Sequence, residues 1–287
     1  MIFPIDYFLK VNAVLLALAA VYHLAFHRVN LPVLKRFFLL GGSLLALLLP
    51  LIRFRSAVDG TLANYVLTEF TTDTTMNTTT KIWSMASLLW FAYASVALFF
   101  FARIVYGLLR LLNLKRRSVP HLVGNTLVHM NPSVSHTFSF ASLIFSPSVQ
   151  LQEEVLLHEQ VHIKRLHTAD NVFFALLTAV CWINPAVFYL ARKSTENHEY
   201  EVDRVLIQRG TPAATYTESL IAHVLHHQGV FMTHSFSAFQ ILKTRITMMN
   251  TQSSKRAAAR LLYVLPATAL ALVLAQACSK NAPQQQT

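Results

Sequence analysis

Long apolar stretches constrain this chain more than any other feature of its sequence. A helix needs about 20 mostly apolar residues to cross the hydrocarbon core of a bilayer. The stretches that approach or reach this length are Tyr7–Phe26, Leu31–Ile52, Ile82–Leu112 and Leu261–Cys278. Only 13% of all residues are charged, whereas soluble domains carry about 25%. The sequence therefore predicts a mainly α-helical membrane protein with about four transmembrane helices.

The formal net charge of +11 comes from basic residues that cluster beside the apolar stretches. These clusters are Arg28, Lys35 and Arg36; Arg110, Lys115, Arg116 and Arg117; and Lys255, Arg256 and Arg260. Lysine and arginine next to membrane spans mark the cytoplasmic side. This placement fits membrane topology better than nucleic-acid binding, so we expect no direct nucleic-acid partner. The partners we expect are the lipid bilayer and a protein or peptide substrate.

These clusters divide the chain into four parts. We expect a three-helix transmembrane region over residues 1–112, a cytoplasmic domain over 113–257, a fourth transmembrane helix over 258–278 and a polar, disordered tail over 279–287.

Short segments of the cytoplasmic domain predict a mixed α and β structure. Thr126–Val134 and Thr137–Phe145 are typical of two extended segments separated by a proline-containing turn. Ser146 followed by Pro147 is typical of a helix start, and the helix is expected to continue beyond Leu166. A second, polar helix is predicted over Ala191–Arg209.

The segment His158-Glu159-Gln160-Val161-His162 lies on the first of these helices. Residues four apart share one helix face, so both imidazoles can reach one metal ion. Glu159 is the expected general base, which accepts a proton from water at the metal. The HExxH pattern therefore predicts a zinc hydrolase.

A catalytic zinc ion normally has three protein ligands. His167 follows His162 by five residues, about 140° around a continuous helix, and is poorly placed for the same ion. Glu199 and Asp203 share one face of the later helix, whereas Glu201 points nearly opposite. We assign Glu199 as the third ligand and Asp203 as a group that could orient a ligand histidine. For the oxyanion donor, His198, Tyr200 and Arg204 are candidates by proximity alone.

The apolar stretch near 171–190 lies between the two halves of this site. If it crossed the membrane once, Glu199 would lie on the opposite side from His158 and His162. We therefore expect a buried or re-entrant hairpin whose turn lies at Asn184-Pro185.

These motifs, in this order, resemble the BlaR/MecR-type membrane zinc metallopeptidases, metallopeptidase family 56, in a Bacteroidetes-like form. The resemblance rests on His136–Phe140, His158–His162 followed by His167 and Asp170, Trp182–Pro185, and His198–Asp203 followed by Lys243–Ile246. It implies a small α+β gluzincin-type zinc peptidase domain, with Zn²⁺ held by His158, His162 and Glu199 and with Glu159 as the base.

The resemblance also implies a multi-pass protein of the bacterial inner membrane that signals by cleaving a transcriptional repressor. No Ser-x-x-Lys with partner motifs is present, so we expect no penicillin-binding sensor domain. Two alternatives stay open: a membrane quality-control or processing peptidase like the HtpX and CAAX types, and a non-proteolytic receptor or scaffold with a vestigial zinc site.

Overall fold

The computed structural model describes residues 3–26, 29–51, 85–226 and 232–251. Within these segments, three helices are long and apolar enough to cross a membrane, over Tyr7–Phe26, Pro32–Leu51 and Ser87–Arg117. They correspond to α1 (Phe3–Val21) with the π-helical turn η1 (Tyr22–Phe26), to α2 (Pro32–Leu48) with the 3-10 turn η2 (Leu49–Leu51), and to α3 (Met85–Arg117). The first three predicted spans coincide with these helices.

Several sequence predictions lie outside the described residues. They are the basic cluster Lys255, Arg256 and Arg260, the fourth helix 258–278 and the tail 279–287. The predicted domain boundaries therefore stay predictions.

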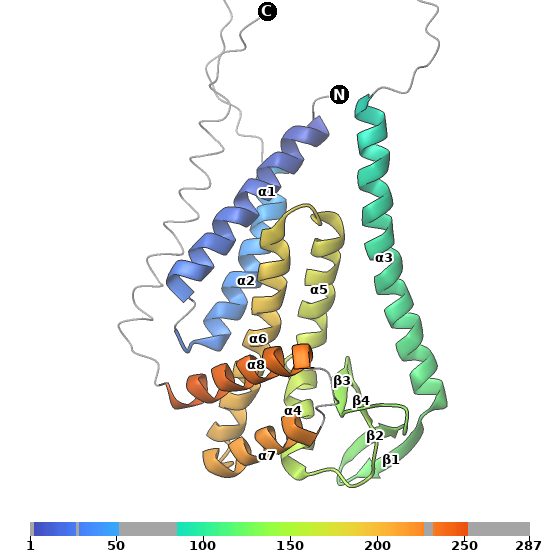
Figure 1. Ribbon diagram of the computed structural model, residues 1–287, viewed down its shortest axis with the longest axis vertical. Coiled ribbons are helices and arrows are strands. Elements are labelled where there is room, and N and C mark those ends of the chain that lie inside the picture. The colour runs from blue at the N-terminus through green and yellow to red at the C-terminus, as the bar shows by residue number, and fades with distance from the viewer. Residues whose placement is uncertain (1–2, 27–28, 52–84, 227–231, 252–287) are drawn as a thin grey trace, which may run out of the picture.

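A helical hairpin fills the space between α1 and α2 on one side and α3 on the other (Figure 1). Its arms are α5 (His167–Val180) and α6 (Pro185–Gln208), and the chain reverses between Cys181 and Asn184. Asn184 caps α6 by accepting a hydrogen bond from the Ala186 backbone N–H, and its amide donates to the Asn12 carbonyl of α1. Because α6 returns toward the domain, Glu199 lies on the same side as α4 (Glu153–Lys164). The polar helix predicted from Ala191 begins earlier, at Pro185.

A four-stranded sheet follows α3 at the end farthest from the N-terminus (Figure 1). Its strands, in the order β1-β2-β4-β3, are β1 (Val119–Val123), β2 (Thr126–Met130), β4 (Leu143–Ser146) and β3 (Phe138–Phe140). Strand β1 was not predicted. The single extended segment predicted over Thr137–Phe145 is wrong, because the chain turns at Ala141, which has a φ of 52° and donates its N–H to the Thr168 hydroxyl. β3 is consequently an edge strand.

Helix α4 begins later and ends earlier than the sequence predicts. Ser146 is the last residue of β4 and donates its hydroxyl to the Ser148 carbonyl, so it does not cap a helix. The helix begins at Glu153, where two glutamates favour the positive end of the helix dipole. It ends at Lys164, because Leu166 adopts left-handed backbone angles (φ 56°) and α5 starts at His167. The predicted continuation beyond Leu166 is wrong, and His167 is not on the same helix as His162.

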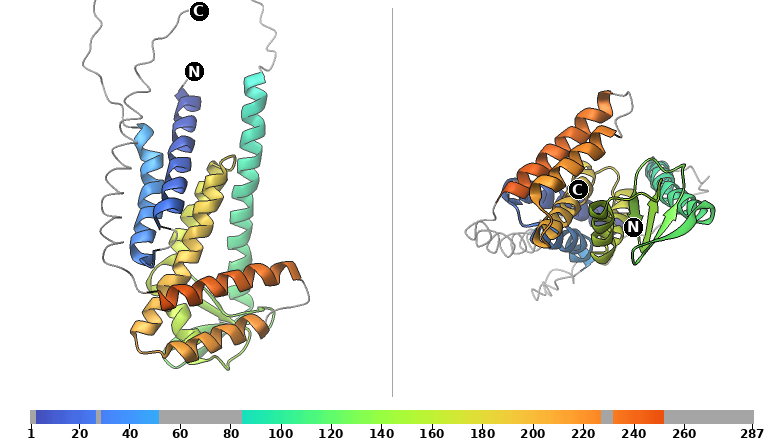
Figure 2. Two further views of the ribbon diagram at one scale, coloured as in Figure 1. Left: turned by 60° about the vertical axis from the view of Figure 1, so that its left-hand side comes forward. Right: turned by 90° about the horizontal axis from the view of Figure 1, so that it is seen from below.

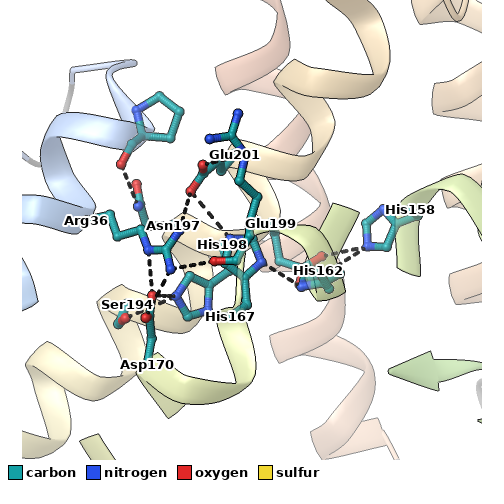
Figure 3. Close-up of polar contacts among 12 residues, drawn as sticks. Arg36, His158, His162, His167, Asp170, Ser194, Asn197, His198, Glu199 and Glu201 are labelled. Atoms are coloured by element: carbon teal, nitrogen blue, oxygen red, sulfur yellow. Dashed lines mark hydrogen bonds and ion pairs between the residues drawn. The ribbon is translucent and has the colours of Figure 1, made fainter. Parts of the chain in front are cut away.

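A buried polar cluster joins α2 to the hairpin (Figure 3). Arg36 of α2 forms two hydrogen bonds to the Asp170 carboxylate, of 2.7 and 3.1 Å, and one of 2.6 Å to the Arg165 carbonyl. Its guanidinium also lies 3.8 Å from Glu201, and His198 contacts the same Asp170 at 2.9 Å. Both carboxylates are buried. Arg36 therefore balances two buried negative charges between α5 and α6.

We predict that Arg36→Gln destabilises the fold, because it leaves the buried Asp170 without its arginine partner and leaves Glu201 with only the more exposed Arg165. Breaking a buried ion pair costs about 3–5 kcal/mol. Arg192→Gln is the matched control, since it removes an exposed arginine paired with Glu196, a type of pair worth about 0–1 kcal/mol. Unfolding midpoints of both variants in detergent measure the difference. Equal midpoints would contradict the assigned role of Arg36.

Candidate metal centre

Two histidines of α4 and one glutamate of α6 meet at one point (Figure 3). The Nε2 atoms of His158 and His162 lie 3.1 Å apart. The two carboxylate oxygens of Glu199 lie 3.5 Å from them, one from each. Ligand atoms of all three residues fall within 4.8 Å of one another. These are the three ligands predicted from the sequence, and the structure brings them together.

The hydrogen-bond partners of His158 indicate which of its two ring nitrogens carries the proton. Its Nδ1 lies 2.9 Å from the Tyr216 hydroxyl, which donates its one proton to Asp203 at 2.8 Å. Tyr216 can therefore only accept toward His158, so Nδ1 carries the imidazole proton. The Nε2 atom is left with a lone pair that faces the common point. Asp203 thus acts on His158 through Tyr216, a residue of α7 (Ala213–His226).

His162 has a corresponding chain of contacts. Its Nδ1 lies 2.9 Å from Nδ1 of His167, whose Nε2 lies 3.4 Å from the Glu201 carboxylate. Burial lowers the pKa of His162 to about 3 and also lowers the pKa of His167, so both rings are neutral at neutral pH. His167 donates to Glu201 through Nε2, accepts from His162 through Nδ1, and leaves the Nε2 lone pair of His162 free.

Three electron-pair donors therefore converge with no proton between them. Burial alone raises the pKa of Glu199, but the positive charge of Arg245, 2.9 Å away, outweighs burial and lowers this pKa, so the carboxylate is ionised. The separations of 3.1, 3.5 and 3.5 Å approach the edge of about 3.3–3.4 Å of a tetrahedron with metal–ligand bonds of about 2.0–2.1 Å. This set of donors can hold a metal ion.

Glu159 faces the same cavity but contacts a different partner. The hydroxyl of Ser139, on edge strand β3, donates to the Glu159 carboxylate at 2.6 Å. Glu159 is buried, and burial raises its pKa, although the nearby His158 and the Ser139 hydrogen bond partly offset this rise. A carboxylate whose pKa lies closer to neutral is better suited to exchange protons with water.

The cavity over the three donors has a volume of about 340 Å³ and is lined by residues of β3, α4, α5, α6, α7 and α8 (Met232–Asn250). None of the oxyanion donors suggested by proximity lines it. His198 contacts Asp170, the ring of Tyr200 lies under the Lys35 ammonium, and Arg204 borders a different cavity. Among the described residues that line the cavity, Arg245 is a donor side chain close to the metal-facing atoms.

Sequence reasoning missed four residues that support this centre. They are Ser139, His167, Tyr216 and Arg245. His167 was excluded because a continuous helix was assumed. Arg245 bridges Glu199 at 2.9 Å and Asp203 at 2.6 Å, and only its place in a family-like motif could have indicated it. Nothing in the sequence near Tyr216 signals a role.

Residues 141–249 match the family model described as BlaR1 peptidase M56. This match supports the BlaR/MecR-type M56 peptidase family. The matched segment contains His158, His162 and Glu199, together with Tyr216 and Arg245, and the match and the apolar helices together indicate a membrane metallopeptidase. No curated protein matches the chain.

We predict that Tyr216→Phe weakens binding of a divalent metal by about 10–100-fold, the usual effect of removing a partner that orients a ligand histidine. The variant keeps the buried ring but removes the hydroxyl between His158 and Asp203. Tyr189→Phe is the control, because its hydroxyl contacts His23 instead. Competition with a chromophoric chelator measures both affinities. If the metal affinity of Tyr216→Phe is unchanged, the Tyr216 hydroxyl does not orient His158 for metal binding.

Proposed function

We propose that this chain is an integral-membrane zinc metalloendopeptidase that hydrolyses peptide bonds in a protein substrate. The observation that carries the proposal is the convergence of two unprotonated imidazole nitrogens and one ionised carboxylate beside the separate carboxylate of Glu159. Two histidines and one glutamate are a ligand set typical of catalytic zinc in peptidases, which keeps one coordination position open.

His158, His162 and Glu199 would hold the zinc ion. When bound, zinc supplies a Lewis acid that polarises the peptide carbonyl and makes water more acidic. Tyr216 and His167 keep the imidazole protons on the Nδ1 atoms, so that the Nε2 lone pairs remain available. Arg245 offsets the negative charge of Glu199.

Glu159 is the proposed general base. It takes a proton from the attacking water and passes it to the leaving amine, while the Ser139 hydroxyl holds the carboxylate toward the cavity. Arg245 lines the cavity and is the donor that we propose for the developing oxyanion.

An extended peptide would bind along β3. Within the described segments this strand pairs with β4 alone, and Thr137–Ser139 line the cavity. A substrate strand added at this edge would use backbone hydrogen bonds and bring one of its carbonyl groups over the metal-facing atoms. The family resemblance makes a transcriptional repressor the candidate substrate and signal transduction the candidate role.

We predict that Glu159→Gln abolishes peptide hydrolysis but retains zinc. The amide has nearly the same shape yet cannot accept a proton, and general acid–base catalysis contributes about 10²–10⁴ in rate. The variant and the wild-type protein are purified in detergent, zinc is measured by elemental analysis, and substrates are compared by proteomics of cells that express either form. One defined cut protein would favour signalling, whereas many misfolded membrane proteins would favour the quality-control type.

Substitutions of the proposed zinc ligands should behave differently from Glu159→Gln. His158→Ala and Glu199→Gln are expected to lose zinc and activity together, whereas Glu196→Gln, on the same helix but paired with Arg192 and Lys193, should keep both. If Glu159→Gln hydrolyses peptides at the wild-type rate, the mechanism is wrong and a scaffold with a vestigial site becomes the better description.

We further propose that the peptidase domain faces the cytoplasm of a bacterial inner membrane. Support comes from Lys115, Arg116 and Arg117, which form the last turn of α3 where it meets the sheet. In a chain with its native cysteines replaced, Ser118→Cys should react with an impermeant maleimide only when the cytoplasmic side is opened. Labelling from the outer side of intact spheroplasts would reverse the proposed topology.

A further inference from the structure

A second cavity, of about 740 Å³, lies between the domain-side ends of the first two spans, the middle of α6, and α8. Four cationic side chains line it: Lys35, Arg192, Lys193 and Lys243. Among the described residues that line this cavity, Glu196 is the one carboxylate. We call this cavity the basic pocket. Its volume falls within the range of about 300–1,000 Å³ of small-molecule sites.

Glu196 does not neutralise the basic pocket. One of its oxygens lies 2.6 Å from the Lys193 ammonium and the other 3.0 Å from the Arg192 guanidinium. Both oxygens are thus engaged by cations of their own helix, and the positive charges of Lys35 and Lys243 are left over.

The burial of Lys35 indicates what kind of ligand the basic pocket would bind. Only 2% of the surface of Lys35 is exposed, and within the described part of the chain it forms no ion pair. Its ammonium lies over the ring of Tyr200, 5.7 Å from the ring centroid. Burial of an ammonium group is strongly disfavoured unless an anion accompanies it. The basic pocket therefore has the chemistry of an anion site that the described protein does not complete.

The surroundings of the basic pocket point to a membrane lipid as the source of this anion. Tyr22 and Lys35 lie in the candidate spans Tyr7–Phe26 and Pro32–Leu51, near their domain-side ends. Helix α8 runs across these ends at a steep angle to the spans (Figures 1 and 2). It brings Phe239 and Ile241, both exposed, to the same pocket as Lys243. Basic pockets between transmembrane helices on the cytoplasmic side bind anionic headgroups.

We propose that the basic pocket binds the phosphate of an anionic membrane lipid, with Lys35 as its buried counter-ion and Phe239 and Ile241 beside the acyl chains. The phosphate would accept hydrogen bonds from the Lys35 and Lys243 ammonium groups, and the apolar residues would exclude soluble phosphates that lack a chain. This site is separate from the metal centre, so its test needs no peptidase activity.

Native mass spectrometry of the full chain in a non-ionic detergent provides the test. Dioctanoyl phosphatidylglycerol should bind at least about tenfold more tightly than dioctanoyl phosphatidylcholine, and Lys35→Met should weaken phosphatidylglycerol binding by about tenfold or more, as expected for a lost charge-assisted hydrogen bond. Arg116→Gln, which removes an exposed cation at the end of α3, should leave both affinities unchanged.

Lys243→Gln keeps the test decisive if Lys35→Met does not fold, because Lys243 is exposed on α8. This variant should weaken phosphatidylglycerol binding by about threefold or more. Equal binding of the two lipids, or an equal loss in Arg116→Gln, would overturn the proposal. Inorganic phosphate that binds as tightly as phosphatidylglycerol, with the same dependence on Lys35, would overturn the lipid source and leave a site for soluble phosphate.

Discussion

The imidazoles of His158 and His162 face each other through unprotonated nitrogens, with the ionised carboxylate of Glu199 beside them. Without a cation, these electron pairs would repel one another. They come from helices separated by an apolar stretch that is nearly long enough to cross a bilayer. The reversal of the chain between Cys181 and Asn184 is therefore required, since it returns α6 to the end of the molecule where α4 lies.

The contacts that hold these nitrogens extend in two directions. From His158 they lead through Tyr216 and Asp203 to Arg245 of α8. From His162 they lead through His167 to Glu201, and from there to Arg36 of α2 (Figure 3). Each direction ends on an arginine that balances a buried carboxylate. The second direction joins the metal centre to a candidate transmembrane helix, so a displacement of α2 relative to α6 would act on the support of His162.

The sequence alone predicted the apolar helices and the three metal-facing residues, because both depend on local spacing. Hydropathy over about 20 residues identifies spans, and residues four apart on one helix share a face. What could not be predicted depends on contacts between distant segments. Thr168 of α5 fixes the turn at Ala141 that divides the expected strand. The helix break at Leu166 turns His167 toward His162, and no glycine or proline at this position predicts it. Tyr216 lies 58 residues from His158, and no periodicity connects them.

The order of elements along the chain has a consequence for biosynthesis. All three metal-facing residues precede Gln208, the end of α6. Tyr216 and Arg245, which set the tautomer of His158 and offset the charge of Glu199, lie on α7 and α8. A nascent chain that has emerged only as far as α6 thus contains the complete ligand set without the groups that orient it. Helices α7 and α8 are synthesised after the three metal-facing residues, so the groups that orient His158 and offset the charge of Glu199 become available only when most of the matched segment 141–249 has left the ribosome.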